Sequence, residues 1–149
     1  MIFNKKFYFS LLLLVFAVIF IFFPRNNKKN EVVLGGKTFF VEIADTNAKQ
    51  VRGLSGHKPL LDNQGMLFIF QKPDKYGFWM KDMNFPIDIL WIDSNYKIIH
   101  IEKSLAPKSY PKVFYPEAPV QYVLEIPAGS SSALGIKVKD SVTFVKNNL

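Results

Sequence analysis

Cysteine is absent from this 149-residue chain, and several kinds of chemistry are excluded with it. A chain without cysteine has no disulfide, no thiolate nucleophile and no cysteine-ligated zinc or iron–sulfur site. The chain also lacks a G-x-S-x-G motif, a phosphate-binding glycine loop and any internal repeat. Its length corresponds to one domain, so a multidomain enzyme is excluded as well.

Outside the first thirty residues, neither basic nor acidic side chains are in marked excess. The chain has 19 basic and 12 acidic residues, and its net charge of +7 at first suggests nucleic acid. Five of the basic residues and no acidic residue lie in residues 1–30, which leaves 14 basic and 12 acidic residues in the other 119. This balance is not the electrostatic footprint of a nucleic-acid-binding domain, and we predict no nucleic-acid partner.

The one long apolar run, Phe7–Phe23, follows a short basic tail, residues 1–6. The run has seventeen residues without a charge. As a helix it would be roughly 26 Å long at ~1.5 Å per residue, close to the ~30 Å hydrocarbon core of a bilayer. It is longer than the apolar part of a typical signal peptide, and no small-x-small cleavage site follows. We therefore predict a signal anchor that spans the cell membrane once; secretion after signal cleavage is the alternative.

The basic residues before and after this span bear on its orientation in the membrane. Two lysines precede the run, and three basic residues follow it in a polar linker, residues 24–31. Charge counts alone slightly favour a cytoplasmic domain, but a basic head before a long apolar run is typical of an anchor whose N-terminus stays inside. We expect the domain of residues 32–145 to be extracytoplasmic.

Short apolar runs separated by turn signals fill the domain. Two pairs of runs are joined by two-residue turns, Gly35-Gly36 and Ser94-Asn95, as in β-hairpins. The pattern predicts a mainly β fold, an antiparallel sandwich or barrel of seven or eight strands with one or two short helices. The expected strands are residues 32–34, 37–43, 66–70, 76–80, 87–93, 96–102, 120–126 and 138–145.

Two segments differ from this β pattern. Residues 44–53 predict a short helix, capped by Asp45 or Thr46 and ended by Gly53 or Gly56. Residues 105–119 carry four prolines and predict a long ordered loop.

Carboxyl groups inside apolar strands are the first candidates for a functional site. Asp88 and Glu125 each lie in a strand whose neighbours are apolar. Because residues i and i+2 share a strand face, both side chains are expected to be partly buried. A buried carboxylate needs a cation or several hydrogen-bond donors, and the sequence offers Arg52 and Lys81 as candidate cations.

Two interpretations of these residues are possible. Arg52, Lys81, Asp88 and Glu125 could line a charged pocket that binds a ligand, with Trp79 stacking on it. Alternatively, Arg52 and Asp88 could form a buried ion pair that fixes the fold, and Trp79 could be a core aromatic.

Metal ligands are sparse. The methionines and two histidines would suit copper outside the cytoplasm, but isolated methionines more often fill gaps in a core. We predict no metal and no cofactor.

Several sequence blocks, taken together and in order, resemble the family called domain of unknown function 192. The blocks are Arg52-Gly53-Leu54, Gly65–Phe68, Phe78–Lys81, Pro86–Ile89 and Val123–Gly129. The resemblance implies one compact β-rich domain, similar to a jelly-roll-like sandwich and frequently behind a signal or anchor. It implies no established reaction, cofactor or ligand. Two positions depart from the family pattern: Ser55 stands where methionine is common, and Asp82-Met83 stand where Asn-Thr is common.

We predict a non-enzymatic, membrane-tethered β-domain that binds an extracytoplasmic ligand or protein. The candidate ligand-binding residues are Arg52, Trp79, Lys81, Asp88 and Glu125. One alternative is a cell-envelope hydrolase whose acid and base are Asp88 and Glu125, which requires the two carboxyl groups about 5–9.5 Å apart across a cleft. Another alternative is a scaffold for a second membrane protein.

Overall fold

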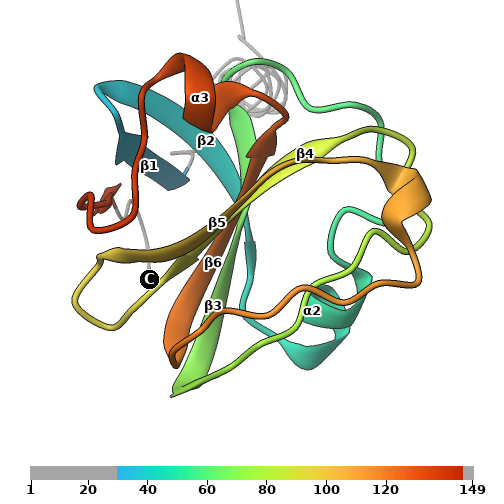
Figure 1. Ribbon diagram of the computed structural model, residues 1–149, viewed down its shortest axis with the longest axis horizontal. Helices are drawn as coiled ribbons and strands as arrows, with labels where there is room; N and C mark the ends of the chain where they lie inside the picture. Colours follow the sequence, from blue (N-terminus) through green and yellow to red (C-terminus); the bar gives the residue numbers. More distant parts are fainter. Residues whose placement is uncertain (1–29, 146–149) are drawn as a thin grey trace, which may run out of the picture.

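Seven strands, two short α-helices and one 3-10 helix make up residues 30–145, the part of the chain that the computed structural model describes (Figure 1). The strands are β1 (Asn30–Leu34), β2 (Lys37–Ala44), β3 (Gln64–Asp74), β4 (Ile87–Ile92), β5 (Ile98–Leu105), β6 (Val120–Pro127) and β7 (Thr143–Val145). The helices are α2 (Asn47–Arg52), η1 (Pro107–Ser109) and α3 (Ser130–Ala133). The fold is therefore mainly β, as the sequence predicts.

The strands form one sheet in the order β5-β4-β6-β3-β2-β1-β7. Neighbouring strands are antiparallel except β2 and β3, which are parallel and are connected through α2. Of the two expected architectures, sandwich or barrel, the described strands form one sheet rather than two stacked ones, and the β2–β3 pair departs from the expected antiparallel pairing. Strand lengths and hairpins can be read from local patterns, but the parallel pairing joins runs that are distant in sequence.

This sheet curls until its two edges meet at one end. The backbone N–H of Ile98 donates to Asp140 at 3.0 Å, and the N–H of Lys139 donates to the Ile98 carbonyl at 2.8 Å. A third bond runs from the Val142 N–H to the Tyr96 carbonyl, at 2.9 Å. The segment before β7 thereby pairs with the start of β5, which gives the sheet a partly closed, barrel-like shape.

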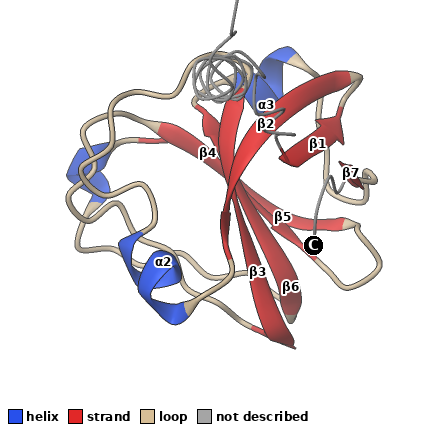
Figure 2. Cartoon of the chain, turned by 180° about the vertical axis from the view of Figure 1, so that it is seen from behind, coloured by secondary structure: helices blue, strands red, loops and turns tan. Residues whose placement is uncertain are grey.

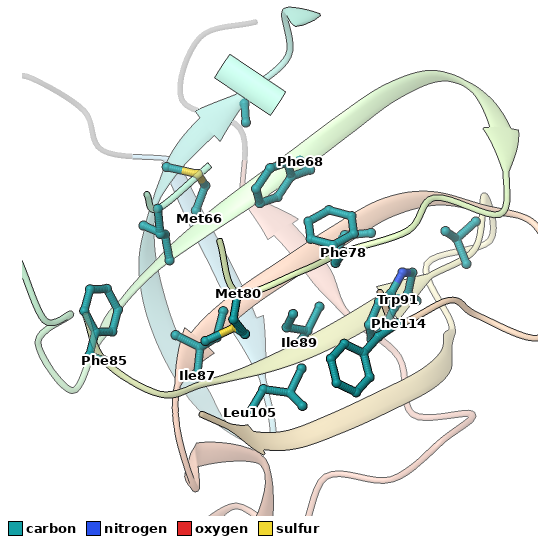
Figure 3. Close-up of a cluster of buried hydrophobic side chains, with 14 residues drawn as sticks. Met66, Phe68, Phe78, Met80, Phe85, Ile87, Ile89, Trp91, Leu105 and Phe114 are labelled. Atoms are coloured by element: carbon teal, nitrogen blue, oxygen red, sulfur yellow. The ribbon is translucent and has the colours of Figure 1, made fainter. Parts of the chain in front are cut away.

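Both faces of the sheet carry a hydrophobic core. All six residues of β4 are buried, as expected for a central strand, and they alternate between the two faces. The loop-side core lies under α2 and the long loops, and its residues include Met66, Phe68, Phe78, Met80, Phe85, Ile87, Ile89, Trp91, Leu105 and Phe114 (Figure 3). The hairpin-side core lies toward β1, β7 and α3, and its residues include Val32, Phe39, Leu67, Leu90, Ile92, Leu124 and Ile126. Both ribbon views place α2 on the opposite side of the sheet from β1 and β7 (Figures 1 and 2).

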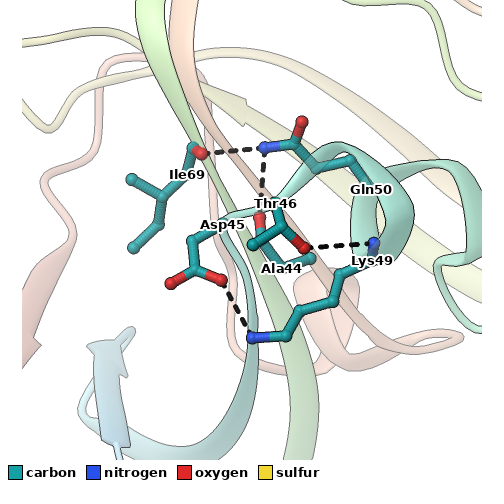
Figure 4. A network of polar contacts seen from close by, with 6 residues as sticks. All are labelled: Ala44, Asp45, Thr46, Lys49, Gln50 and Ile69. Atoms are coloured by element: carbon teal, nitrogen blue, oxygen red, sulfur yellow. Dashed lines mark hydrogen bonds and ion pairs between the residues drawn. The ribbon is translucent and has the colours of Figure 1, made fainter.

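Helix α2 begins where the sequence predicts. Thr46 is the N-cap, and its hydroxyl accepts the backbone N–H of Lys49 at 3.4 Å (Figure 4). The other candidate cap, Asp45, instead pairs with the Lys49 ammonium at 2.9 Å, and this hydrogen bond lowers the pKa of the Asp45 carboxyl. Gly53 ends the helix, so the helix prediction is confirmed.

One expected strand is absent from the described sheet and another is shorter than predicted. Residues 76–80 form a loop that pairs with Phe114 only at Phe78, and residues 138–145 contain only the three-residue strand β7. The predicted loop at residues 105–119 is confirmed apart from η1 and that single bridge.

The expected membrane span, Phe7–Phe23, lies outside the described residues, as do the tail and most of the linker. Between residues 30 and 145 no helix is long and apolar enough to cross a bilayer.

Candidate functional site

A cavity of about 180 Å³ opens between α2 and the loop that follows β3, on the loop side of the sheet. This volume far exceeds the ~10–15 Å³ that a single water requires, and it is below the ~300–1,000 Å³ of drug-sized sites. The lining consists of the end of α2, five aromatic side chains and one carboxyl group: Gln50, Val51, Arg52, Gly53, Leu54, Ser55, Phe68, Phe70, Tyr76, Gly77, Phe78, Trp79, Met83 and Glu125. The cavity therefore suits a small molecule that combines apolar and polar groups.

Glu125 supplies the carboxyl group from the middle of β6. It pairs with Met66 of β3 on one side and with Ile89 of β4 on the other, so its strand neighbours are apolar. Its side chain is 5% exposed, and Oε2 has no hydrogen-bond partner within the described part of the chain. This burial raises the pKa of Glu125 to about 8. In the unliganded protein the carboxyl group is thus mostly protonated at neutral pH.

Aromatic rings form the walls of the cavity. Phe70 and Tyr76 are stacked, with ring centroids 3.5 Å apart and planes 8° from parallel. Phe68 meets Phe78 edge to face at 4.8 Å. Aromatic faces carry negative potential and attract cations as well as apolar groups. The walls therefore favour a ligand with an apolar or cationic head.

The loop that carries Tyr76 and Phe78 is held by hydrogen bonds to the sheet and to a second loop. Trp91 Nε1 donates to the Tyr76 carbonyl at 2.9 Å. Phe78 and Phe114 exchange both backbone hydrogen bonds, at 2.9 and 2.8 Å. Figure 3 shows the Phe78 ring lying in the same core as Trp91. These bonds fix the aromatic walls before any ligand arrives.

The opposite wall is the end of α2. Gln50 fixes this end to the sheet, because its Nε2 donates to the carbonyls of Ile69 at 2.9 Å and Ala44 at 3.3 Å (Figure 4). Gly53 then turns the chain with φ 49° and ψ −137°, a conformation that favours glycine. A Cβ atom at Gly53 would lie 3.4 Å from the Phe68 ring.

Arg52 and Trp79 stand at the rim. Arg52 is the last residue of α2 and is exposed, and its side chain makes no hydrogen bond or ion pair with another described residue. Trp79 is 45% exposed although it lines the cavity. Both side chains are therefore available to a ligand.

Asp88 lies on the other face of the sheet. It is 0% exposed, and its carboxylate accepts the backbone N–H groups of Ser104 at 2.7 Å, Gly129 at 3.0 Å and Ser131 at 2.8 Å. The Ser131 hydroxyl adds a fourth bond at 2.6 Å. Asp88 pairs with Ile126, whereas the neighbouring strand position Ile89 pairs with Glu125. Since adjacent positions of a strand point to opposite faces, the two carboxyl groups cannot act on one substrate.

The structure thus brings together three of the five predicted site residues: Arg52, Trp79 and Glu125. Asp88 makes no bond to Arg52, and its partners are backbone groups and one serine. The Lys81 side chain is exposed and outside the cavity lining, while its carbonyl accepts the Ser55 hydroxyl at 2.9 Å.

The aromatic walls and Gln50 were missed at the sequence level. The four wall residues are Phe68, Phe70, Tyr76 and Phe78. Their density between residues 68 and 79 is the available signal, but the same density is typical of a core. Gln50 carries no signal, because its acceptors are backbone carbonyls.

A second hollow, of about 380 Å³, lies on the hairpin side. Its walls include Tyr96, Tyr122 and Phe144, and burial together with a hydrogen bond to Tyr96 raises the pKa of Tyr122 to about 12. The hollow contains none of the predicted site residues. Within residues 30–145 no cluster of three or more histidine, aspartate or glutamate residues is placed to hold a metal ion.

Comparison with known proteins shows to which family the domain belongs. The model of the DUF192 family, described as an uncharacterised ACR, matches residues 30–144. The chain belongs to this family. The match covers the cavity and the whole sheet except the last residue of β7, and it confirms the resemblance seen in the sequence blocks. The family name itself states no activity.

Three similar proteins are described by names or titles that state no established activity. A UPF0127 protein of Pyrococcus abyssi is 29% identical over 126 residues, which cover 80% of this chain and 95% of the relative. A crystal structure of a Novosphingobium aromaticivorans protein of unknown function superposes with a TM-score of 0.71 at 32% identity, over 77% of this chain and 83% of that one. A Sinorhizobium meliloti protein, proposed as a transcription regulator, has a TM-score of 0.71 at 28% identity, over 78% and 92% of the two chains.

Proposed function

We propose that this DUF192 domain is a binding module that takes a small ligand into the cavity between α2 and the loop after β3. One observation supports this most: Glu125 lines an aromatic cavity, and its buried Oε2 has no hydrogen-bond partner among residues 30–145. Leaving such a group unsatisfied costs roughly 1–3 kcal/mol. A ligand that hydrogen-bonds or pairs with Glu125 offsets that cost on binding.

Binding is favoured over hydrolysis by the placement of the carboxyl groups. Glycoside hydrolysis of the usual kind needs two carboxyl groups on either side of one scissile bond. Glu125 faces the cavity, while Asp88 is hydrogen-bonded on the opposite face of the sheet. The pair named in the hydrolase alternative is therefore not available to a single substrate.

Nucleic acid is not favoured as the partner. One structural neighbour has been proposed as a transcription regulator. Beyond residue 30, however, this chain has 14 basic and 12 acidic residues, whereas a nucleic-acid-binding surface needs a marked excess of positive charge.

The proposed setting of the module is a membrane surface outside the cytoplasm. Phe7–Phe23, a charge-free run of seventeen residues, is the anchor in this proposal. Its length approaches that of a bilayer-spanning helix, and the basic residues before it favour an N-terminus that stays inside.

Ligand binding is tested with the full chain in detergent micelles, labelled with fluorotryptophan and observed by fluorine NMR. The chain has two tryptophans, of which Trp79 lines the cavity and Trp91 is fully buried away from its lining. We expect a pool of small polar metabolites to shift the Trp79 resonance and leave the Trp91 resonance in place. If cationic, zwitterionic, anionic and neutral pools all leave Trp79 unmoved, the domain is not a small-ligand module of this kind.

Anchoring is tested by alkaline extraction of membranes from cells that express the full chain or a variant lacking residues 1–23. We expect the full chain to stay with the membrane and the shortened chain to be released. A reporter that is active only in the cytoplasm, fused after Leu149, should be inactive. An active reporter would show that the domain is cytoplasmic. Release of the full chain by alkaline extraction would show that residues 7–23 do not anchor it.

A further inference from the structure

The charged groups that line the cavity between α2 and the loop after β3 indicate which kind of molecule fits it. Glu125 lines it from within the buried strand β6. Arg52 lines it from an exposed position at the end of α2. The same cavity is lined by aromatic rings, so it combines a buried carboxyl group, aromatic walls and an exposed guanidinium group.

We infer that the cavity binds a small zwitterion, with the ligand's ammonium group against Glu125 and the aromatic walls and its anionic group at Arg52. This inference rests on the proposed ligand-binding function and specifies the chemical class of the ligand. Compounds of the betaine and amino-acid type have the required pair of charges on a short scaffold.

The interior end selects for a cation. A carboxylate without a protein cation is stabilised when a ligand cation pairs with it, and the low local dielectric strengthens the pairing. Phe70 and Tyr76 are already stacked, and Phe68 and Phe78 already meet edge to face, so no rearrangement precedes binding. A cation held against such rings is attracted by their negative faces, and more strongly when it is desolvated.

The rim selects against a simple cation. The Arg52 guanidinium group has no hydrogen-bond or ion-pair partner among residues 30–145, and its positive charge repels a ligand that carries positive charge alone. A carboxylate on the ligand removes this repulsion and offers the bidentate geometry that guanidinium groups favour. The two ends together fit a ligand with no net charge but with separated charges.

Binding in this way is linked to a proton. The ionisable side chains in the lining are Arg52, Tyr76 and Glu125 itself. Because burial keeps Glu125 protonated up to a pH of about 8, a cationic head group displaces its proton on binding. We expect the affinity for the zwitterion to rise as the pH increases toward that value.

The test uses the full chain in lipid nanodiscs and three probes of similar size, followed by calorimetry. Glycine betaine is the zwitterion, 3,3-dimethylbutanoate replaces its nitrogen by carbon, and tetramethylammonium lacks its carboxylate. We expect glycine betaine to bind at least about tenfold more tightly than either of the others, a difference of about 1.4 kcal/mol. Glycine has the same charges without the methyl groups. Its affinity relative to glycine betaine shows whether the aromatic walls favour a methylated ammonium group.

Matched variants locate the two charges. Glu125→Gln keeps the shape of the side chain, and we expect it to weaken glycine betaine at least about tenfold and to abolish the pH dependence. Arg52→Gln, at an exposed position, should weaken glycine betaine and leave tetramethylammonium unchanged or bound more tightly. Glu117→Gln alters an exposed glutamate outside the cavity and should change neither affinity.

The outcomes separate this inference from the proposed function. If 3,3-dimethylbutanoate or an uncharged metabolite shifts the Trp79 resonance while zwitterions do not, the domain is a binding module and the inference of a zwitterion is wrong. If zwitterions bind but Arg52→Gln and Glu125→Gln bind them equally well, the inference is also wrong. If no probe or metabolite binds, both proposals fail.

Discussion

Asp88 and Ser131 are joined by two short hydrogen bonds, from the serine hydroxyl at 2.6 Å and from its backbone N–H at 2.8 Å. The pair connects the central strand β4 to the start of α3, and both residues are fully buried. Breaking a buried, hydrogen-bonded charge is strongly destabilising, because the uncompensated group remains in the core. The Asp88 carboxylate therefore stabilises the fold, whereas Oε2 of Glu125 has no hydrogen-bond partner within residues 30–145.

Substitution at this pair should cost stability and leave the cavity intact. We expect Asp88→Asn to lower the free energy of unfolding by about 3 kcal/mol, since an amide cannot accept all four bonds. Ser131→Ala should lower it by about 1.5–3 kcal/mol, the value of one hydrogen bond to a charged group. Urea unfolding measures both. Ser132→Ala, at an exposed neighbouring position, is the control.

Stability should also depend on pH through Glu125. Its pKa is about 8 in the folded protein and near the ordinary 4.5 in the unfolded chain, so the folded state binds the extra proton between these values. The free energy of unfolding should therefore be highest below about 4.5 and fall as the pH rises through about 8, by about 1.4 kcal/mol per unit of pKa difference. Urea midpoints across this range measure the effect. In Glu125→Gln the decline should be largely absent, and an equal decline in that variant would assign it to other groups.

A methyl group at Gly53 should disturb the cavity. Gly53→Ala places a side chain at positive φ and 3.4 Å from Phe68, and we expect a loss of about 1–3 kcal/mol together with a shifted Trp79 resonance. Gly56→Ala is the matched variant, because Gly56 also has positive φ but has no neighbouring atom within 4 Å of its would-be Cβ. It should lose stability without moving Trp79. The same shift in both variants would mean that Gly53 does not shape the cavity wall.

The start of α2 offers a milder test. Thr46→Ala removes the hydroxyl that accepts the Lys49 N–H, and we expect a loss of about 1 kcal/mol. Thr46→Ser keeps the hydroxyl and should retain most of that stability. Thermal unfolding followed by circular dichroism compares the two. Equal losses would show that the methyl group of Thr46, rather than its hydroxyl, is what stabilises the helix.

Local features of the fold could be read from the sequence because they depend on neighbouring residues. The Gly35-Gly36 turn, the helix capped by Thr46 and ended by Gly53, and the buried strand β4 are all of this kind. The choice of one sheet over a sandwich, and the order of its strands, could not be read in this way. Both depend on the parallel pairing of Val41 with Gly65 and its neighbours, and no local pattern specifies which distant strand a strand will join.

Strand alternation identified the two unusual carboxyl groups but not their partners. Formal charge suggested Arg52 for Asp88, yet the actual donors are backbone N–H groups 16 to 43 residues away and one hydroxyl. Backbone donors carry no residue-specific signal, so such a partner cannot be found by searching for opposite charges. Conversely, only the packing of the whole surrounding core shows that Oε2 of Glu125 has no hydrogen-bond partner among residues 30–145.

The meeting of the sheet's two edges has a further consequence for how copies of this domain behave when crowded together. An exposed strand edge is a template on which another chain can add a strand, and proteins concentrated at a surface meet one another often. Here the backbone groups of Tyr96 and Ile98, at the start of β5, are already bonded to residues 139–142 of the same chain. The domain thereby occupies part of its own edge, which reduces the backbone available for edge-to-edge aggregation.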